Sequence, residues 1–501
     1  MSVYAMGHGW TGALGTGRFD DHIKGHDDEE DPDPPTLLYK GDVLSAAAGW
    51  GHTALVTNES NGRQRLLMCG RPHDLQAILR LNRFPAWLRH KAVHYSHSYK
   101  EDERSINVTA LAGRFIQWAL NEQTQRQIEQ DPTMRLWELA KTYSILSELE
   151  EVEMPNYDAP LSVVASAGLT AVLGQVGGTL YTMGLNNRGQ CGIGYSSNNV
   201  WVPQQVMGLS DDYATHGREY LYQAFPVSQV ALGLQHGYAL CSQGNLYSWG
   251  KAERCQLGQA DASEAAQDGS QVDYARHVKK AYELDSEERP DWFFFPRVVQ
   301  IASGFQHGAA LTESTNQVFV WGKNVLPPMR SDQRQGKLAS DSRAPTPVKG
   351  LPPNLQVIQI ACGSHHTAML MEDGSVYAVG ICTDDATQIL FEPVCVVPSG
   401  IIDMPCRQFE AHFDRTTIVG RDGRQVLQFH LWADPELREY GVFTPFWADS
   451  LLLDNEHARI KSIHRGWLHT IVVTEHDDLL EAGKDPRTPI GDGRPGNQIA
   501  G

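Results

Sequence analysis

The chain has 501 residues, of which 41% are hydrophobic and 46 are glycine, while charged residues make up 20%. This composition predicts a globular protein rich in turns and favours an all-β fold over a helical one. The formal net charge of −18 argues against sequence-independent binding to DNA or RNA, in which contacts between cations and phosphates dominate the affinity. It favours a basic partner, or a basic patch on a partner.

The eight cysteines are scattered between Cys69 and Cys406 and form no C-x-x-C pair. We therefore expect reduced, buried thiols and an intracellular compartment. No run of 18 apolar residues predicts a membrane span, and residues 1–6 enter a strand-like segment without the apolar core of a signal peptide. The expected location is the cytosol or nucleus, with the mitochondrial matrix as the alternative.

The N-terminal residues predict half of a β-sheet unit. Residues 3–15 read as the second hairpin of a repeat whose first hairpin is missing. Residues 27–35 follow as an acidic loop broken by prolines. Residues 463–473, near the other end, read as a first hairpin. Pairing of the two ends would complete one sheet, although residues 479–493 also resemble a faded second hairpin. We favour the N-terminal hairpin as the partner.

One short sequence motif recurs along the chain with the same residue pattern. It is a glycine, two variable residues, a histidine and a small residue, followed by an apolar run. A unit that repeats every 50 to 70 residues or so predicts a repeat architecture. The five copies are Gly49–Thr53, Gly233–Gly237, Gly304–Gly308, Gly363–Thr367 and Gly466–Thr470.

Residues 228–258 show one repeat in full. Short strands joined by glycine turns at this spacing predict one four-stranded antiparallel sheet. The expected elements are a first strand, a corner that holds His236, a second strand, a turn, a third strand and a closing segment: 230–234, 235–237, 238–241, 242–245, 246–250 and 251–258.

Two degenerate copies pass through Leu169 and Arg415 in place of the histidine and bring the number of first hairpins to seven. One such sheet does not bury both of its faces, whereas seven around an axis do, and the closed ring protects the sheet edges. The expected fold is an all-β, seven-bladed propeller that spans residues 1–501 and closes through the chain ends.

These units resemble the regulator-of-chromosome-condensation repeat. Residues 178–192 carry its second half: Gly-Thr-Leu-Tyr-Thr-Met-Gly-Leu-Asn-Asn-Arg-Gly-Gln-Cys-Gly. The resemblance implies a seven-bladed propeller. Known members include a nuclear exchange factor for the GTPase Ran, a plant UV-B photoreceptor, an Elongator-accessory protein and mitochondrial relatives. The opening residues are most similar to the last two types. The photoreceptor stacks several tryptophans, and here only Trp50 and Trp467 occupy that place.

The repeated histidines are the first candidates for chemistry. His52, His236, His307, His366 and His469 would suit a metal or a catalytic site, yet each occupies the same corner of a repeat. We interpret them as structural residues whose imidazoles hydrogen-bond to local backbone groups. The repeated glycines, such as Gly250, are expected at close approaches or turns. No catalytic residue, metal ligand or cofactor is predicted.

A helical insertion is predicted between residues 72 and 155. Apolar residues recur at helical spacing from Leu136 to Leu146, after an Asp131-Pro132 start signal. A basic run with aromatic residues lies in the same insertion and is a candidate partner-binding segment, although such runs are commonly solvated faces. Its residues are Arg80, Arg83, Trp87, Arg89, Lys91 and Lys100.

Two further insertions are predicted at residues 260–290 and 330–343. The first is acidic, and Glu283 and Asp285 are its candidate partner-binding residues; the second is a polar loop. Together these features favour a non-enzymatic scaffold that binds protein partners through rim loops and the helical insertion. A small GTPase and a ribosomal or Elongator-type complex are the candidate partners. One alternative is a guanine-nucleotide exchange factor that uses residues 260–290 as a wedge against a small GTPase. The other is an RNA- or ribosome-associated assembly factor.

Overall fold

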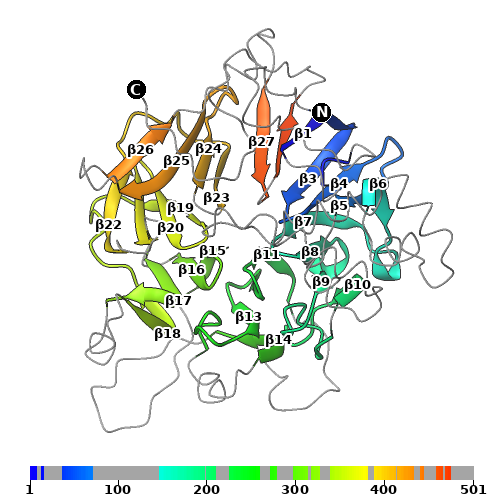
Figure 1. Cartoon of the computed structure of the whole chain (residues 1–501), viewed down its shortest axis with the longest axis horizontal. Coiled ribbons are helices and arrows are strands. Elements are labelled where there is room, and N and C mark those ends of the chain that lie inside the picture. The colour runs from blue at the N-terminus through cyan, green and yellow to red at the C-terminus, as the bar shows by residue number, and fades with distance from the viewer. Residues whose placement is uncertain are drawn as a thin grey trace, which may run out of the picture.

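The fold is an all-β, seven-bladed propeller, as predicted. Seven sheets, each of four antiparallel strands, surround a common axis (Figure 1). In the residues that it describes, the computed structural model contains strands and two short 3-10 turns, Pro155–Tyr157 and Val176–Gly178. It describes residues 1–7, 13–15, 36–70, 146–197, 199–209, 225–259, 271–278, 297–313, 317–327, 339–381, 389–412, 415–433, 440–444, 459–466 and 469–475.

Blades 1 to 3 are built from consecutive strands. Blade 1 contains β3 (Asp42–Ala48), β4 (His52–Asn58), β5 (Gln64–Gly70) and β6 (Leu146–Val152). Blade 2 contains β7 (Pro160–Ala165), β8 (Leu169–Gly174), β9 (Leu180–Leu185) and β10 (Asn199–Gln205). Blade 3 contains β11 (Val227–Leu232), β12 (His236–Cys241), β13 (Leu246–Lys251) and β14 (Gln271–His277).

Blades 4 to 6 follow the same order. Blade 4 contains β15 (Val298–Ser303), β16 (His307–Thr312), β17 (Val318–Leu326) and β18 (Ser340–Pro347). Blade 5 contains β19 (Val357–Cys362), β20 (His366–Met371), β21 (Val376–Ile381) and β22 (Ile389–Val397). Blade 6 contains β23 (Gln408–His412), β24 (Arg415–Val419), β25 (Val426–Ala433) and β26 (Tyr440–Thr444).

Blade 7 joins the two ends of the chain. Its sheet has the order β2-β1-β28-β27, so that β27 (Ile460–Arg465) and β28 (His469–Thr474) meet β1 (Ser2–Gly7) and β2 (Thr36–Lys40). Strands β1 and β28 pair from Ser2 opposite Thr474 to Gly7 opposite His469. Figure 1 shows the blue β1 and the orange-red β27 in this one sheet, and β28 lies between them. The ring is therefore closed by hydrogen bonds and not by a covalent connection.

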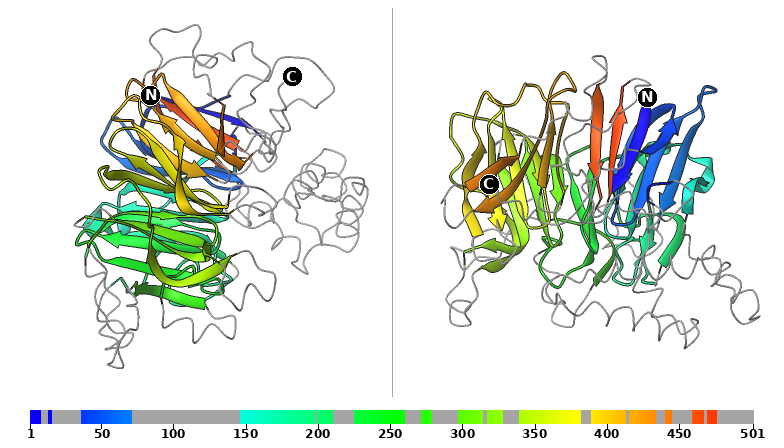
Figure 2. Two further views of the ribbon diagram at one scale, coloured as in Figure 1. Left: turned by 90° about the vertical axis from the view of Figure 1, so that its left-hand side faces the viewer. Right: turned by 45° about the horizontal axis from the view of Figure 1, so that its top comes forward.

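The ring has two distinct faces. The first strand of each blade contacts that of the next, which places these strands nearest the axis. The Gly-x-x-His corners join first to second strands on one face, here called the corner face. On the same face the third strand ends, because Gly250 pairs with His236 and Gly70 pairs with His52. The other face, called the linker face, holds the links from one blade to the next; Figure 2 shows the ring from the side.

Two of the predicted insertions fall inside blades, between third and fourth strands, whereas the acidic one includes β14 and continues into the link between blades 3 and 4. The prediction that residues 251–258 close the third blade is wrong, because its fourth strand is β14, which lies within the segment expected as the acidic insertion. Residues 252–258 form two consecutive turns instead, with the Cys255 amide donating to Ala252 and the Gly258 amide to Cys255. Residues 146–152 and 340–343, placed by prediction in insertions, likewise belong to the fourth strands β6 and β18. The predicted helical residues up to 145 lie outside the described part of the chain.

The blades pack through aromatic side chains near the rim of the ring. Trp249 and Trp321 are completely buried third-strand residues. The Trp249 indole donates to the carbonyl of Gln190 in the preceding blade over 2.8 Å, and the Trp321 indole donates to that of Gln256 over 3.0 Å. Buried indole N–H groups need an acceptor, and a glutamine carbonyl at the equivalent position of the preceding blade supplies it in both cases. This contact fixes the spacing between neighbouring blades.

We expect Gly250→Ala to destabilise the protein by about 3 kcal/mol. Gly250 has φ +101°, and a methyl group there would meet the carbonyl oxygen of Gln235 and come within 2.7 Å of the His236 Cα. Gly62→Ala is the control: Gly62 has φ +82° but nothing within 4 Å, and should cost about 1 kcal/mol. Urea unfolding of both variants measures the difference, and equal losses would contradict the steric explanation.

Candidate functional site

The two predicted partner-binding segments lie in connections whose described ends are on opposite faces of the ring. Arg80, Arg83, Trp87, Arg89, Lys91 and Lys100 lie outside the described residues, as do Glu283 and Asp285. The first set belongs to the connection from β5 to β6, which starts and ends on the corner face. The second set belongs to the connection from β14 to β15. That connection starts on the linker face, because the end of β14 at His277 pairs with Tyr247 at the start of β13.

The repeated histidines link neighbouring blades. Each Nε2 lies within hydrogen-bonding distance of a hydroxyl on the next blade. The predicted partner of each imidazole was a local backbone group. Because each contact joins side chains of two neighbouring blades, the five contacts hold those blades together. The pairs are His469 with Thr53 (3.0 Å), His52 with Thr170 (2.9 Å), His236 with Ser303 (3.1 Å), His307 with Thr367 (3.2 Å) and His366 with Thr416 (3.2 Å).

The chemistry of these histidines is that of buried neutral rings. The Thr53 hydroxyl donates to the Ala13 carbonyl over 2.8 Å, so it accepts from His469, whose Nε2 then carries the proton. Burial lowers the pKa of His52, His236 and His307 to about 3 and that of His469 to about 4. Neutral, inward-facing rings with hydroxyl partners suit a structural role and not proton transfer.

A second set of contacts joins the innermost strands. The side-chain amide of Gln300 accepts from the Ile360 amide (2.8 Å) and donates to its carbonyl (3.1 Å) in the next blade. Gln408 makes the same pair with Ile463 (2.7 Å each), and Gln229 bridges Val299 and Ile301. A carboxamide both donates and accepts, so it pairs with a strand edge as another peptide group would. At these three junctions the glutamines thereby satisfy backbone groups on the inner strand of the next blade.

The centre of the corner face holds an aromatic cluster. Trp50 of blade 1 lies 6.2 Å from Phe305 of blade 4, and Phe305 lies 5.7 Å from His365 of blade 5, measured between ring centroids. Burial, and then the charge of Lys323, lower the pKa of His365 to about 4. Blades 1 and 4 are not neighbours, so these side chains brace the ring across its axis. Trp467, the other tryptophan of the repeats, lies outside the described residues.

A small polar cluster lies between the innermost strands of blades 6 and 7. Glu410 Oε2 is 3.1 Å from His412 Nε2 and 3.6 Å from His464 Nδ1. Burial raises the pKa of Glu410, but the two histidines outweigh it and hold that pKa well below its usual range. No group of three or more His, Cys, Asp or Glu side chains within the described ranges is arranged to hold a metal ion.

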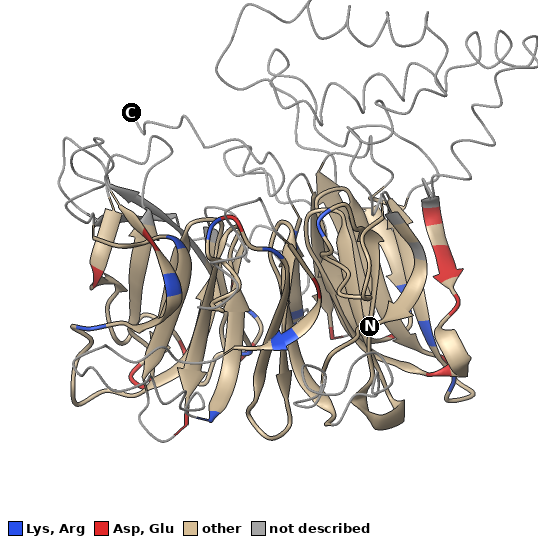
Figure 3. Ribbon diagram, turned by 90° about the horizontal axis from the view of Figure 1, so that it is seen from below, with Lys and Arg blue, Asp and Glu red and all other residues tan. Residues whose placement is uncertain are grey.

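The outer strand of blade 1 is strongly acidic. Glu148, Glu150, Glu151 and Glu153 are exposed on or beside β6, which Figure 3 shows at the side of the ring. Glu151 pairs with Arg63 (2.6 Å) and Arg65 (3.2 Å) of the same blade. Charged side chains on an edge strand discourage pairing with other chains. Protection of this sheet edge therefore accounts for the acidic residues of β6.

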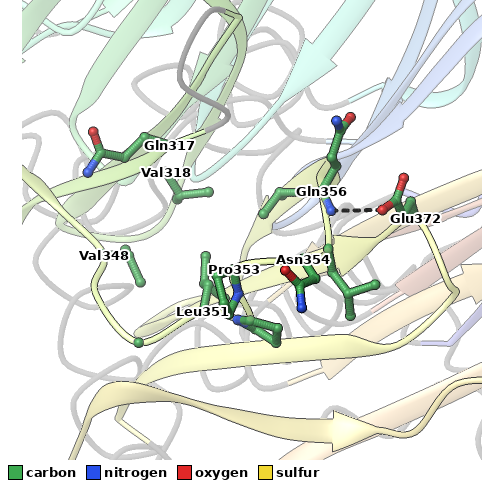
Figure 4. A pocket seen from close by; sticks show the side chains of 12 residues that line it. Gln317, Val318, Val348, Leu351, Pro353, Asn354, Gln356 and Glu372 are labelled. Atoms are coloured by element: carbon green, nitrogen blue, oxygen red, sulfur yellow. Dashed lines mark hydrogen bonds between the residues drawn. The ribbon is translucent and has the colours of Figure 1, made fainter.

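A pocket of about 560 Å³ opens on the linker face between blades 4 and 5 (Figure 4). Its wall is the link from β18 to β19, whose Pro352 and Pro353 fix the backbone. The aliphatic side chains of Val318, Val348 and Leu351 line one side. Polar residues make up much of the remaining lining, with Gln356 and Glu372 across the pocket from Val318 and Val348: Gln317, Asn354, Gln356 and Glu372. No pattern of the sequence pointed to this pocket, because it is formed by segments of two blades.

These features define a class of protein before any comparison. Seven four-stranded blades, five of them with the same histidine corner, make a β-propeller built from one sequence repeat. Two models of the regulator of chromosome condensation (RCC1) repeat match the chain, one at residues 177–240 and the other at 227–254, 298–325 and 357–381. The chain belongs to the RCC1 repeat family.

Relatives of several kinds share parts of this propeller. The human probable E3 ubiquitin-protein ligase HERC6 is 27% identical over 203 residues, which cover 40% of this chain and 16% of that protein. The guanine nucleotide exchange factor SRM1 of Saccharomyces cerevisiae is 28% identical over 162 residues, which cover 32% of this chain and 29% of that protein. The chain therefore matches less than a third of either relative.

The fold is shared over the whole propeller with a solved structure. The structure of Prp20p from Saccharomyces cerevisiae, described with its binding properties to Gsp1p and histones, has a TM-score of 0.54 and 15% sequence identity. The match covers 97% of this chain and 92% of that one. In the part of the chain described here, no helix is long and apolar enough to cross a membrane.

Proposed function

We propose that this protein is a non-enzymatic scaffold that binds protein partners through loops on the faces of its propeller. The observation that carries the proposal is the placement of the long connections. The longest of them, residues 71–145, leaves and re-enters the corner face, as do residues 8–35 of blade 7 and 252–270 of blade 3. A rigid ring that presents loops from several blades on one face is a common way to build a binding surface.

Guanine-nucleotide exchange on a small GTPase is the second candidate. The similarity to SRM1 supports it, and exchange needs a competing surface and no catalytic motif. The wedge expected at residues 260–290 is interrupted by β14, however, so a wedge would have to come from residues 260–270 on one face or 279–296 on the other. Crosslinks to a GTPase therefore identify the face as well as the activity.

The proposal predicts specific crosslinks between the tagged full-length protein and its partners in its own cells. Partners crosslinked at Lys91, Lys100 or Lys251 bind the corner face, and those crosslinked at Lys279, Lys280 or Lys349 bind the linker face. We expect a stable protein complex, of ribosomal or Elongator type, joined through the corner face. A small GTPase joined at Lys279 or Lys280 would favour exchange instead, and recovery of RNA alone would contradict both.

A matched variant tests the role of the longest connection. Residues 72–145 are replaced by a short glycine-serine linker, which a ring should tolerate because shortening a surface loop costs little loop entropy. If the connection carries the binding surface, partner recovery falls at least tenfold while the melting temperature stays near that of the natural chain. Unchanged recovery would move the binding surface elsewhere on the ring.

A further inference from the structure

We infer that the pocket between blades 4 and 5 is a docking site for an extended peptide segment of a partner, with an aliphatic side chain next to a lysine or arginine. This inference rests on the proposed scaffold function and adds a site and a ligand chemistry to it. It concerns the linker face, and so a surface distinct from the corner-face loops.

Aliphatic side chains of the core shared by blades 4 and 5 lie behind the polar lining of the pocket. Val318 is completely buried and Val357 is 4% exposed, while Val348, Leu351 and Leu355 are half-buried and pack against the core shared by blades 4 and 5. A pocket of about 560 Å³ is in the range that holds one or two side chains of a ligand. An aliphatic side chain would find contacts there that water does not provide.

The polar groups of the pocket match a peptide main chain. Gln317, Asn354 and Gln356 each carry a carboxamide, which donates and accepts as a peptide group does. Asn354 and Gln356 are exposed, and in Figure 4 Asn354 lies beside Pro353 in the middle of the pocket. The backbone groups of a peptide lying in the pocket would thus remain hydrogen-bonded. A purely aliphatic ligand would leave these carboxamides without a partner.

Glu372 gives the site its charge preference. One of its oxygens, Oε1, accepts from the Gln356 amide over 3.2 Å, which holds the carboxylate at the edge of the pocket. Its neighbour Asp373 is occupied by Ser375, whose amide and hydroxyl donate to it over 2.9 and 2.6 Å. Among the described residues no basic side chain forms an ion pair with Glu372, so its second oxygen is available to a cation of the partner.

Partly exposed aliphatic residues also occur on the innermost strands of blades 4 and 5. Each of β15 and β19 has a bulge, after Val298 and after Val357, where the register of pairing shifts by one residue. The bulged residues Val299 and Ile358 are 37% and 45% exposed. Ile358 follows Val357 of the pocket directly, so a second apolar side chain of the bound segment has a surface to contact.

The test uses a random heptapeptide phage library selected on the immobilised full-length protein, with affinities of the enriched peptides measured by fluorescence anisotropy. We expect an aliphatic residue beside Lys or Arg in the enriched sequences. Glu372→Lys should weaken binding about tenfold or more, and Asn354→Trp, a change at an exposed position, should abolish it by filling the pocket. Asp403→Lys is the matched control, because it makes the same charge change on the linker face one blade further on.

Two results would overturn the inference. One is the enrichment of no peptide, or of peptides without the expected pair. The other is equal binding to the natural protein, Glu372→Lys and Asn354→Trp. The scaffold proposal is tested separately by crosslinking: partners that remain bound to Asn354→Trp would leave the scaffold function standing without this pocket. Peptide binding to the pocket without any crosslinked cellular partner would support the pocket and contradict the scaffold function.

Discussion

Lowering the pH from 7.5 to 5.5 should remove on the order of 5 kcal/mol from the free energy of unfolding. The cause is the set of four buried histidines with lowered pKa: His52, His236, His307 and His469. Each stays neutral in the folded ring but binds a proton in the unfolded chain below about pH 6.5. Their stabilising contribution is therefore complete above pH 6.5 and is lost as the pH falls toward 3 or 4.

Urea unfolding at a series of pH values, followed by fluorescence of the buried Trp249 and Trp321, measures this loss. The control is His236→Gln, whose amide keeps a donor for Ser303 but binds no proton. At pH 5.5 this variant should take up one proton fewer on unfolding than the natural chain does. Its free energy of unfolding should therefore fall by about 1.4 kcal/mol less between pH 7.5 and 5.5. The remaining charges titrate alike in both proteins. Identical pH dependence in the two would show that the imidazole is charged in the folded ring.

Replacing Val3 by Asp should open the ring at its closing blade and cost about 3 kcal/mol or more. Val3 is completely buried, and it packs with Ile471 and Val473 from the other end of the chain. A carboxylate there would lie in an apolar core, and β1 would pair less well with β28. Hydrogen exchange of the β28 amides should rise, and the melting temperature should fall.

Leu37→Asp is the matched control for this prediction. Leu37 lies on β2 of the same blade, but it is 48% exposed. The same carboxylate at this position should change the free energy of unfolding by about 0.5 kcal/mol or less. If both variants melt together, ring closure does not depend on burial of β1.

The number and kind of the blades follow from local patterns in the amino-acid sequence. Seven first hairpins, five of them with a Gly-x-x-His corner, were enough to predict an all-β ring, because strands, turns and tight corners are local features with local signals. The role of Gly250 as a close approach was also correct, since the corner carbonyl of Gln235 lies against it.

Where the repeats meet, and what lies between them, depends on contacts between residues that are far apart in the chain. The fourth strand β14 is separated from β13 by residues 252–270, and its place in the sheet depends on pairing that no local pattern encodes. The partner of His236 is Ser303, which is 67 residues away on the next blade. The pocket beside Glu372 likewise needs side chains from blades 4 and 5 together. A repeat sequence specifies its own sheet, whereas contacts between sheets arise from packing around the axis.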